Sequence, residues 1–291
     1  MTFKYLMMIL LLCCQLPVAF ADPCDDASQL VLDAHKLPSV EKQKQLLQAA
    51  LARCPNHAEA HNNLGDLLKD EKDYPAAIKH LKQAIDPNST KPNLSQAWHN
   101  LGEVYFQQGQ LPLSLEAHAH ACATDNDSKR IIEHELLKNG KYRVVAEGNV
   151  FNQESLLVLY DKQRSDKIEK LLGGCGLRAI MRPVTIFHGF TFFKPGKLGL
   201  ETQSQQQLNN IIGALQKIEP MKVSVRSYTT ELNDTAANQK LAEKRATTLR
   251  QEFINNKVPS QCQNYVRCIP ASGSAQLDPP TVKQQIEIEA E

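Results

Sequence analysis

One pattern recurs along the N-terminal half of the chain at a spacing of about 34 to 37 residues. Each unit places small residues and large apolar residues at helical spacing, which predicts two antiparallel helices joined by a short turn. The small residues let the paired helices approach closely, and the large residues fill the space beside them. One such hairpin cannot bury its apolar face alone, and about three are needed for a stable stack. This half of the chain is therefore expected to be an all-α stack.

The most regular unit spans residues 95–128, and its pattern is similar to the tetratricopeptide repeat at five of eight signature positions. Residues 58–94 show the same spacing, residues 24–57 fit a degenerate first repeat, and residues 129–139 are expected to form a capping helix. The matching positions are Trp98, Leu101, Gly102, Tyr105 and Ala121 in one unit, and Leu64, Gly65, Ala77 and Ala84 in the other, where Leu68 and Leu81 are apolar substitutes.

Stacked helical hairpins form a concave groove that binds an extended peptide or a helix of a partner protein. The groove-facing positions are polar, which favours a polar peptide or an unidentified envelope protein as the partner. The simpler interpretation, solvated helix faces, remains open for each of them. The positions are Asn62, Asn63, Asp66, His99, Asn100 and Glu103.

The first 21 residues are typical of a secretory signal peptide. Lys4 supplies the positive charge, residues 5–14 form an apolar run, and residues 19–21 form a small-x-small cleavage site. A ten-residue apolar run is too short to span a bilayer. We expect a mature chain that lies outside the cytoplasm and has no transmembrane segment.

A lipoprotein anchor is the less favoured alternative. Cys13 and Cys14 end the apolar run, but Leu11 and Leu12 precede them where a lipidation signal needs small residues. Without the signal peptide, 32 basic residues balance 32 acidic ones, so the charge gives no reason to expect a nucleic-acid partner.

Six cysteines remain after cleavage, an even number in a chain bound for an oxidising compartment. We expect Cys24 to pair with Cys54 across a helical hairpin and Cys262 to pair with Cys268 in one loop, although six cysteines allow fifteen pairings. No cysteine or histidine spacing is typical of a metal site, and neither a metal nor a cofactor is expected.

The C-terminal part, residues 183–291, alternates between strand and helix patterns. Strands are expected at residues 185–193, 221–228, 265–269 and 285–289, and helices at 201–217 and 233–256. Residues 140–182 are expected to be a connector, in which 144–146 and 156–160 fit either short strands or a helix. The expected fold class is therefore an all-α repeat stack followed by a βαβαββ domain.

A short motif in this domain indicates a candidate ligand site. Ser227-Tyr228-Thr229-Thr230 is followed by Asn238, Leu241, Arg245 and Ala246 at fixed spacing. The motif resembles that of OmpA-like peptidoglycan-binding domains, Gly-His-Thr-Asp and then Asn-x-x-Leu-Ser-x-x-Arg-Ala. The resemblance covers roughly a third of the chain and implies the same fold.

In that family the motif binds the zwitterionic end of diaminopimelate in the peptide stem of peptidoglycan. The resemblance implies Thr229, Thr230, Asn238 and Arg245 as the binding residues, with Arg245 forking onto the ligand carboxylate. Thr230 stands where the family has the aspartate that takes the ligand ammonium, which replaces a charge-assisted bond with a neutral one and weakens binding roughly tenfold. The adjacent Glu231 is a candidate substitute, although neighbours on an extended strand point to opposite sides.

Two functions follow. In the first, a non-catalytic periplasmic scaffold binds a partner protein through its repeats and peptidoglycan, weakly, through its OmpA-like domain. In the second, the OmpA-like fold is a protein docking module that no longer binds peptidoglycan. An enzyme is not expected, because no nucleophile, base and acid recur in a catalytic arrangement.

Overall fold

The computed structural model describes residues 23–146, 148–179, 181, 184–188, 193–220, 222–258 and 284–290. The expected signal peptide, the Cys262–Cys268 pairing and the strand at 265–269 lie outside these residues. In the described part of the chain, no helix is both long enough and apolar enough to cross a bilayer.

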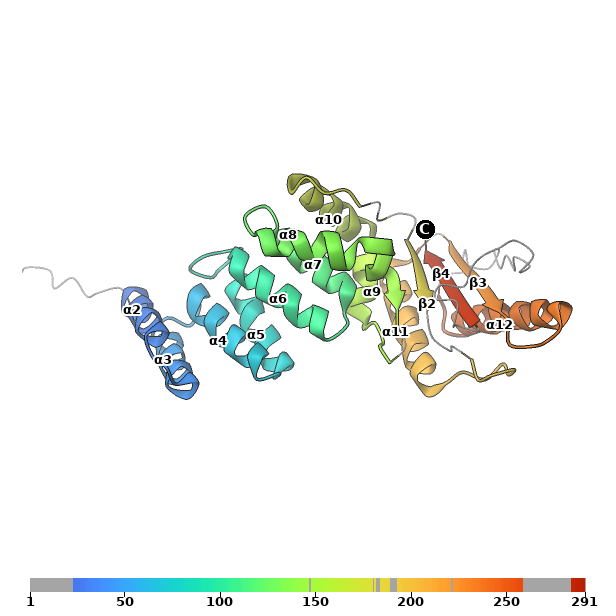
Figure 1. Cartoon of the computed structure of the whole chain (residues 1–291), viewed down its shortest axis with the longest axis horizontal. Helices are drawn as coiled ribbons and strands as arrows, with labels where there is room; N and C mark the ends of the chain where they lie inside the picture. The colour runs from blue at the N-terminus through green and yellow to red at the C-terminus, as the bar shows by residue number, and fades with distance from the viewer. Residues whose placement is uncertain are drawn as a thin grey trace, which may run out of the picture.

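Three helical hairpins form the N-terminal stack (Figure 1). The hairpins are α2 (Pro23–His35) with α3 (Val40–Arg53), α4 (Ala58–Asp70) with α5 (Tyr74–Ala84), and α6 (Ser95–Gln107) with α7 (Leu111–Ala121). The side chains of Ser39, His57 and Asp73 accept hydrogen bonds from backbone N–H groups in the first turns of α3, α4 and α5, respectively, which fixes where these helices begin.

Close helix approach explains the two glycines of the repeat pattern. A Cβ atom on Gly65 would lie 2.7 Å from Leu81, and one on Gly102 would lie 2.7 Å from the ring of His118. Both distances are far below van der Waals contact, so only glycine lets the paired helices pack this closely. The expected Cys24–Cys54 disulfide is confirmed, and it joins the start of α2 to the end of α3.

The end of the stack differs from the single capping helix expected over 129–139. Helix α8 (Asn126–Ile131) begins earlier, because Asp125 caps it, and continues as a π-helical turn η1 (Ile132–Leu136) and a 3₁₀ segment η2 (Lys138–Arg143). Asn139 and Gly140 adopt left-handed φ values of 56° and 65° inside η2, which stops regular helix there.

The middle segment is folded and packs against both of its neighbours. It contains the short strand β1 (Val144–Val145) and the helices α9 (Gln153–Tyr160) and α10 (Lys162–Gly174), so residues 156–160 are helical. A disulfide between Cys122 and Cys175, which the sequence did not indicate, joins the end of α7 to the end of α10. Gln110 fastens the repeats to this segment by hydrogen bonds to Val150, Asn152 and Ser155.

The C-terminal domain is a sheet with helices packed on it. Its described elements are β2 (Val184–His188), α11 (Thr202–Ile218), β3 (Val223–Thr229), α12 (Thr235–Asn255) and β4 (Gln284–Ala290), and the strand order is β1-β2-β4-β3. Strand β4 pairs antiparallel with both β2 and β3, so Ile288 lies opposite Ile186 on one side and Val225 on the other. All three side chains are buried. The α plus α/β fold class is confirmed.

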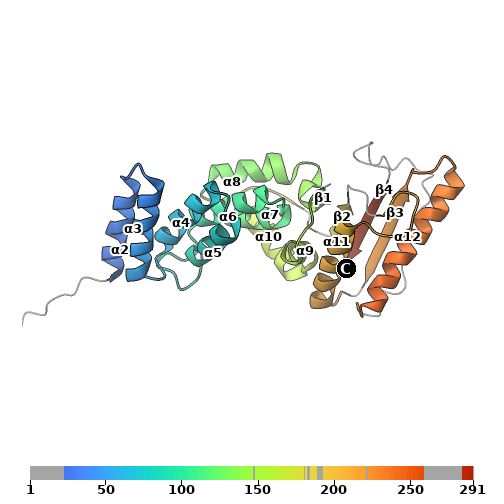
Figure 2. The same cartoon turned by 90° about the horizontal axis from the view of Figure 1, so that it is seen from below.

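Helix α9 connects the two halves physically. Backbone groups of Phe151, just before α9, bond to the side chains of Gln207 and Asn210 on α11 at 2.8 and 3.0 Å. One continuous apolar core runs from Ala77 in α5 to Ala290 in β4, whereas α2 and α3 pack mainly into a smaller separate core with α4. Figure 2 accordingly shows α2 and α3 at one end of the molecule and α12 at the other.

Candidate binding sites

The motif residues meet where β3 ends and α12 begins. Thr229 is buried at the last position of β3, and Thr230 is exposed immediately after it. Asp234 caps α12 by accepting from two backbone N–H groups. The amide of Asn238 bonds both the N–H and the C=O of Leu232, at 2.9 and 2.7 Å. Asn238 therefore fixes the loop that leads into α12, and its amide is occupied.

Arg245 lies beneath this loop with none of its surface exposed. Its guanidinium forks onto the Glu231 carboxylate at 3.1 and 3.0 Å, and it donates to the backbone carbonyls of Lys197 at 3.1 Å and Lys194 at 3.2 Å. The Phe193 ring lies 5.0 Å from the guanidinium carbon. Four of the five guanidinium N–H groups are thus bonded within the chain.

Glu231, which is not part of the motif, is the residue that pairs with Arg245. Its side chain is only 7% exposed, and it also accepts a hydrogen bond from the N–H of Gly196 at 2.6 Å. Arg245 and Glu231 together fasten the turn at 194–199 to α12. Strand β3 ends at Thr229, so the alternation of side chains along a strand no longer applies at position 231 and Glu231 turns inward.

Gln284 holds the base of the same turn. Its side-chain amide both accepts from the N–H and donates to the C=O of Phe193, at 2.9 and 2.8 Å, and the residue is buried. We call the group formed by Arg245, Glu231, Gln284 and the turn at 194–199 the arginine corner. In this corner the buried charges of Arg245 and Glu231 are matched by groups of the chain itself.

The six polar positions expected in the repeat groove lie along α4 and α6 and contact one another or nearby side chains. Asn100 donates to Asn62 at 3.0 Å and Asn62 donates to Asn63 at 3.1 Å, although α4 and α6 belong to different repeats. Asn63 in turn contacts His35 of α2 at 2.9 Å. A small cavity of about 180 Å³ between the first two repeats is lined by Asn63, Asp66 and His35 among others.

Charged members of the groove form a second connected set. The Lys69 ammonium contacts both Asp66 and Glu103 at 2.7 Å, and His99 contacts Asp125 at 2.7 Å. The His99 imidazole and the Lys69 ammonium hold the pKa of Glu103 at about 2. Glu103 in turn raises the pKa of His99. Asn62 and Asn100 are buried, and the other four expected positions are partly exposed. The exposed part of the groove is therefore polar and largely paired.

A serine, two histidines and an aspartate lie in contact beneath the groove. Ser128 bonds His118 at 2.9 Å and His99 at 3.0 Å, and His99 contacts Asp125. Ser128 and His118 have no exposed surface, so no substrate reaches the hydroxyl. Burial lowers the pKa of His118 to about 4 and keeps it neutral. The arrangement packs the repeat and does not fit hydrolysis.

Within the residues that the structure describes, no group of three or more His, Cys, Asp or Glu side chains is arranged to hold a metal ion.

Comparisons with known proteins agree with both halves of this architecture. A family model described as "OmpA family" matches residues 192–289, and models described as "TPR repeat" and "Tetratricopeptide repeat" match residues 65–109 and 46–79. The chain therefore combines tetratricopeptide repeats with a C-terminal OmpA domain.

Similar curated proteins include two sequences of outer membrane protein P5 from Haemophilus influenzae. One is 29% identical over 89 residues, which cover 31% of this chain and 23% of the relative, and the other is 30% identical over 31% and 24%. The matched segment thus spans about a quarter of these relatives. Together with the OmpA match, the similarity supports a place in the cell envelope, and the repeats support a role in protein interaction.

Proposed function

We propose that this protein is a non-catalytic scaffold of the periplasm. Its repeats bind a partner protein along the polar groove of α4 and α6, and its OmpA domain contacts the peptidoglycan stem peptide only weakly. The repeat and OmpA matches support the two binding roles. The contacts of Arg245 support the weakness of the second.

The observation that carries this proposal is that the Glu231 carboxylate already occupies the Arg245 guanidinium. A ligand carboxylate has to displace the Glu231 carboxylate from the guanidinium, and the displaced Glu231 also loses its bond to Gly196. Charge-assisted hydrogen bonds contribute about 1.5 to 3 kcal/mol each, so the exchange gains little. The exposed Thr230 then offers the ligand ammonium only a neutral hydroxyl.

One observation favours the second candidate, a protein docking module. Leu198 and Leu232 are among the few large apolar side chains of the described chain that are exposed, at 41% and 38%. They lie on the two loops that the Glu231–Gly196 hydrogen bond holds together. Exposed apolar side chains beside a buried ion pair are better suited to binding a protein surface than to binding a zwitterionic ligand.

Co-sedimentation of the mature protein with purified sacculi tests the proposal. We compare the wild type with Glu231→Gln, which removes the competing charge, and with Thr230→Asp combined with Glu231→Gln, which also restores the aspartate of the motif. Glu243→Gln, an exposed position on α12, is the matched control. Thermal unfolding checks that each variant is folded.

The proposal expects weak retention of the wild type and of Glu243→Gln, more retention of Glu231→Gln, and the strongest retention of the combined variant. Strong wild-type binding that Glu231→Gln weakens would contradict it, since Glu231 would then be a ligand-binding group. No retention of any variant favours the docking module.

A further inference from the structure

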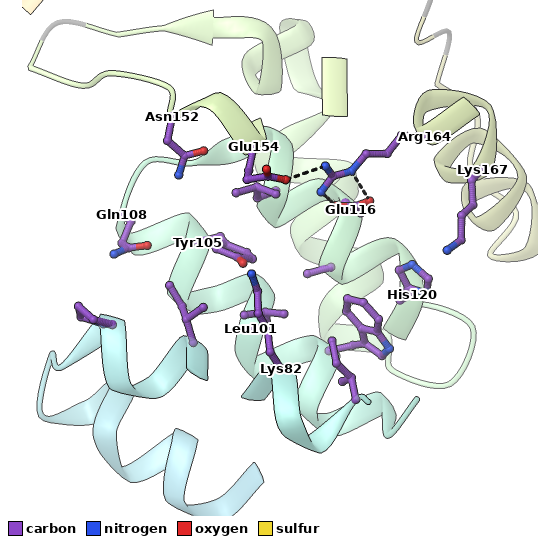
Figure 3. Close-up of a pocket in the computed structure, with 16 residues that line it drawn as sticks. Lys82, Leu101, Tyr105, Gln108, Glu116, His120, Asn152, Glu154, Arg164 and Lys167 are labelled. Atoms are coloured by element: carbon purple, nitrogen blue, oxygen red, sulfur yellow. Dashed lines mark hydrogen bonds and ion pairs between the residues drawn. The ribbon is translucent and has the colours of Figure 1, made fainter. Parts of the chain in front are cut away.

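A cavity of about 520 Å³ opens on the face of the repeats formed by α5 and α7, and α9 and α10 close one side of it (Figure 3). Its volume falls in the range of ligand-binding pockets. It is distinct from the polar groove, because it uses Trp98, Leu101 and Tyr105 of α6, whereas the groove uses His99 and Glu103 on another face of that helix.

The floor of this cavity is largely apolar. Trp98 and His120 stack within it, with ring centroids 4.0 Å apart and planes 8° from parallel. Burial and the nearby Lys167 lower the pKa of His120, so the imidazole is neutral at pH 7 and extends the flat surface of the indole. The apolar lining residues are Pro75, Ile78, Ile85, Trp98, Leu101, Leu113 and Ala117.

The charges at the rim do not balance within the chain. Arg164 forks onto Glu116 at 2.8 and 2.6 Å and contacts Glu154 at 3.2 Å, and the Lys217 ammonium lies 3.9 Å from Glu154, so Arg164 and Lys217 together balance the two carboxylates. Lys82 and Lys167 are exposed, and among the described residues neither has a hydrogen-bond or ion-pair partner. In Figure 3 Lys82 points up toward Tyr105 and Lys167 points toward His120.

We propose that this cavity binds a peptide segment of a partner protein in which acidic side chains flank a bulky apolar one. The apolar side chain lies on the Trp98 and His120 surface, and the acidic groups pair with Lys82 and Lys167 at the rim. A basic or neutral segment leaves the ammonium groups of Lys82 and Lys167 uncompensated, so the charge of the cavity favours an acidic segment. The site is separate from the groove and from the arginine corner, and it does not depend on either.

Tryptophan fluorescence reports on this cavity directly, because Trp98 is the single tryptophan of the chain. The probe is the peptide acetyl-Gly-Glu-Phe-Leu-Glu-Glu-Gly-amide, which contains no tryptophan, and its neutral counterpart has glutamine in place of each glutamate. Each is titrated into the mature protein at low salt while Trp98 fluorescence is measured. The test variant is Lys82→Glu with Lys167→Glu, and the matched control is Lys79→Glu with Lys170→Glu, two exposed lysines on the same helices outside the cavity.

The acidic peptide is expected to give a saturable change in Trp98 fluorescence, and the neutral peptide should bind about tenfold more weakly. The Lys82 and Lys167 reversal is expected to weaken the acidic peptide by more than tenfold, and the control reversal by less than threefold. Three results would overturn the proposal: no saturable change with the acidic peptide, equal binding of both peptides, or equal loss in the test and control variants. Circular dichroism confirms that both variants are folded.

Discussion

The arginine corner and the α5–α7 cavity each contain an arginine forked onto a glutamate, and they differ in the charges that remain. In the corner, Arg245 and Glu231 are buried and satisfy each other, and no exposed charge remains on the pair. In the cavity, Arg164 is satisfied in the same way, but Lys82 and Lys167 stay open to solvent beside an apolar floor. The residues of a binding motif can thus serve as a buried structural ion pair, as in the arginine corner. The α5–α7 cavity, which no sequence motif indicated, is the region that retains unpaired charge.

The largest effect is expected from Arg245→Ala, which leaves the Glu231 carboxylate buried without its partner. Breaking a buried pair on one side costs about 3 to 5 kcal/mol. Urea unfolding followed by circular dichroism should show this loss, whereas Lys244→Ala, at an exposed position on α12, should change the unfolding free energy by less than about 0.5 kcal/mol. A small effect of Arg245→Ala would mean that the corner is not a structural fastening.

The next effect concerns His118, a buried histidine of the repeats whose pKa burial lowers. Its folded pKa of about 4 lies below the ordinary 6.5, so the unfolded chain takes up the proton first as the pH falls. The His118 contribution to stability is complete above pH 6.5 and declines by about 3 kcal/mol toward pH 4. Unfolding free energies measured between pH 4 and 7 should fall more steeply in the wild type than in His118→Gln, and equal slopes would refute this assignment.

A smaller loss is expected from Gly102→Ala. The added Cβ meets the His118 ring at 2.7 Å, and overpacking of this kind costs about 1 to 3 kcal/mol. Gly174→Ala is the control, because nothing lies within 4 Å of its added Cβ at the end of α10. Thermal unfolding should show a lower midpoint for Gly102→Ala alone. If both variants unfold alike, close packing does not explain the repeat glycine.

The smallest effect is expected at the cavity rim. Lys82→Glu with Lys167→Glu removes no contact within the described chain, so stability should change by no more than about 0.5 kcal/mol. Urea unfolding beside Arg245→Ala measures the contrast between the two regions directly. A loss above 2 kcal/mol would show that these lysines, like Arg245, hold the fold together.

Local patterns predicted more of the fold than of the sites. The repeat glycines and leucines act over one or two helical turns, so their spacing alone indicated hairpins. Cys24 lies at the start and Cys54 at the end of one such hairpin, so their pairing also follows from local structure. The Cys122–Cys175 disulfide depends on how α10 packs on α7, which no local pattern encodes.

The arginine corner shows the same limit at a single residue. The resemblance implied that Arg245 binds a ligand carboxylate, whereas the structure buries Arg245 against the chain's own Glu231. The sequence could not assign its partner, because that choice depends on where β3 ends. Glu231 lies two residues beyond the strand, so its side chain is free to turn toward the guanidinium. Peptidoglycan binding by Thr229, Thr230, Asn238 and Arg245 therefore stays a prediction.

Calorimetric titration with free meso-diaminopimelate tests most directly whether Glu231 competes with the ligand for Arg245. Wild type and Glu231→Gln are compared, with Glu243→Gln as the control and thermal unfolding as the check of folding. Glu231→Gln is expected to bind diaminopimelate at least several-fold more tightly than the wild type. Tight binding by the wild type that Glu231→Gln abolishes would contradict it, because Glu231 would then hold the ligand and not replace it.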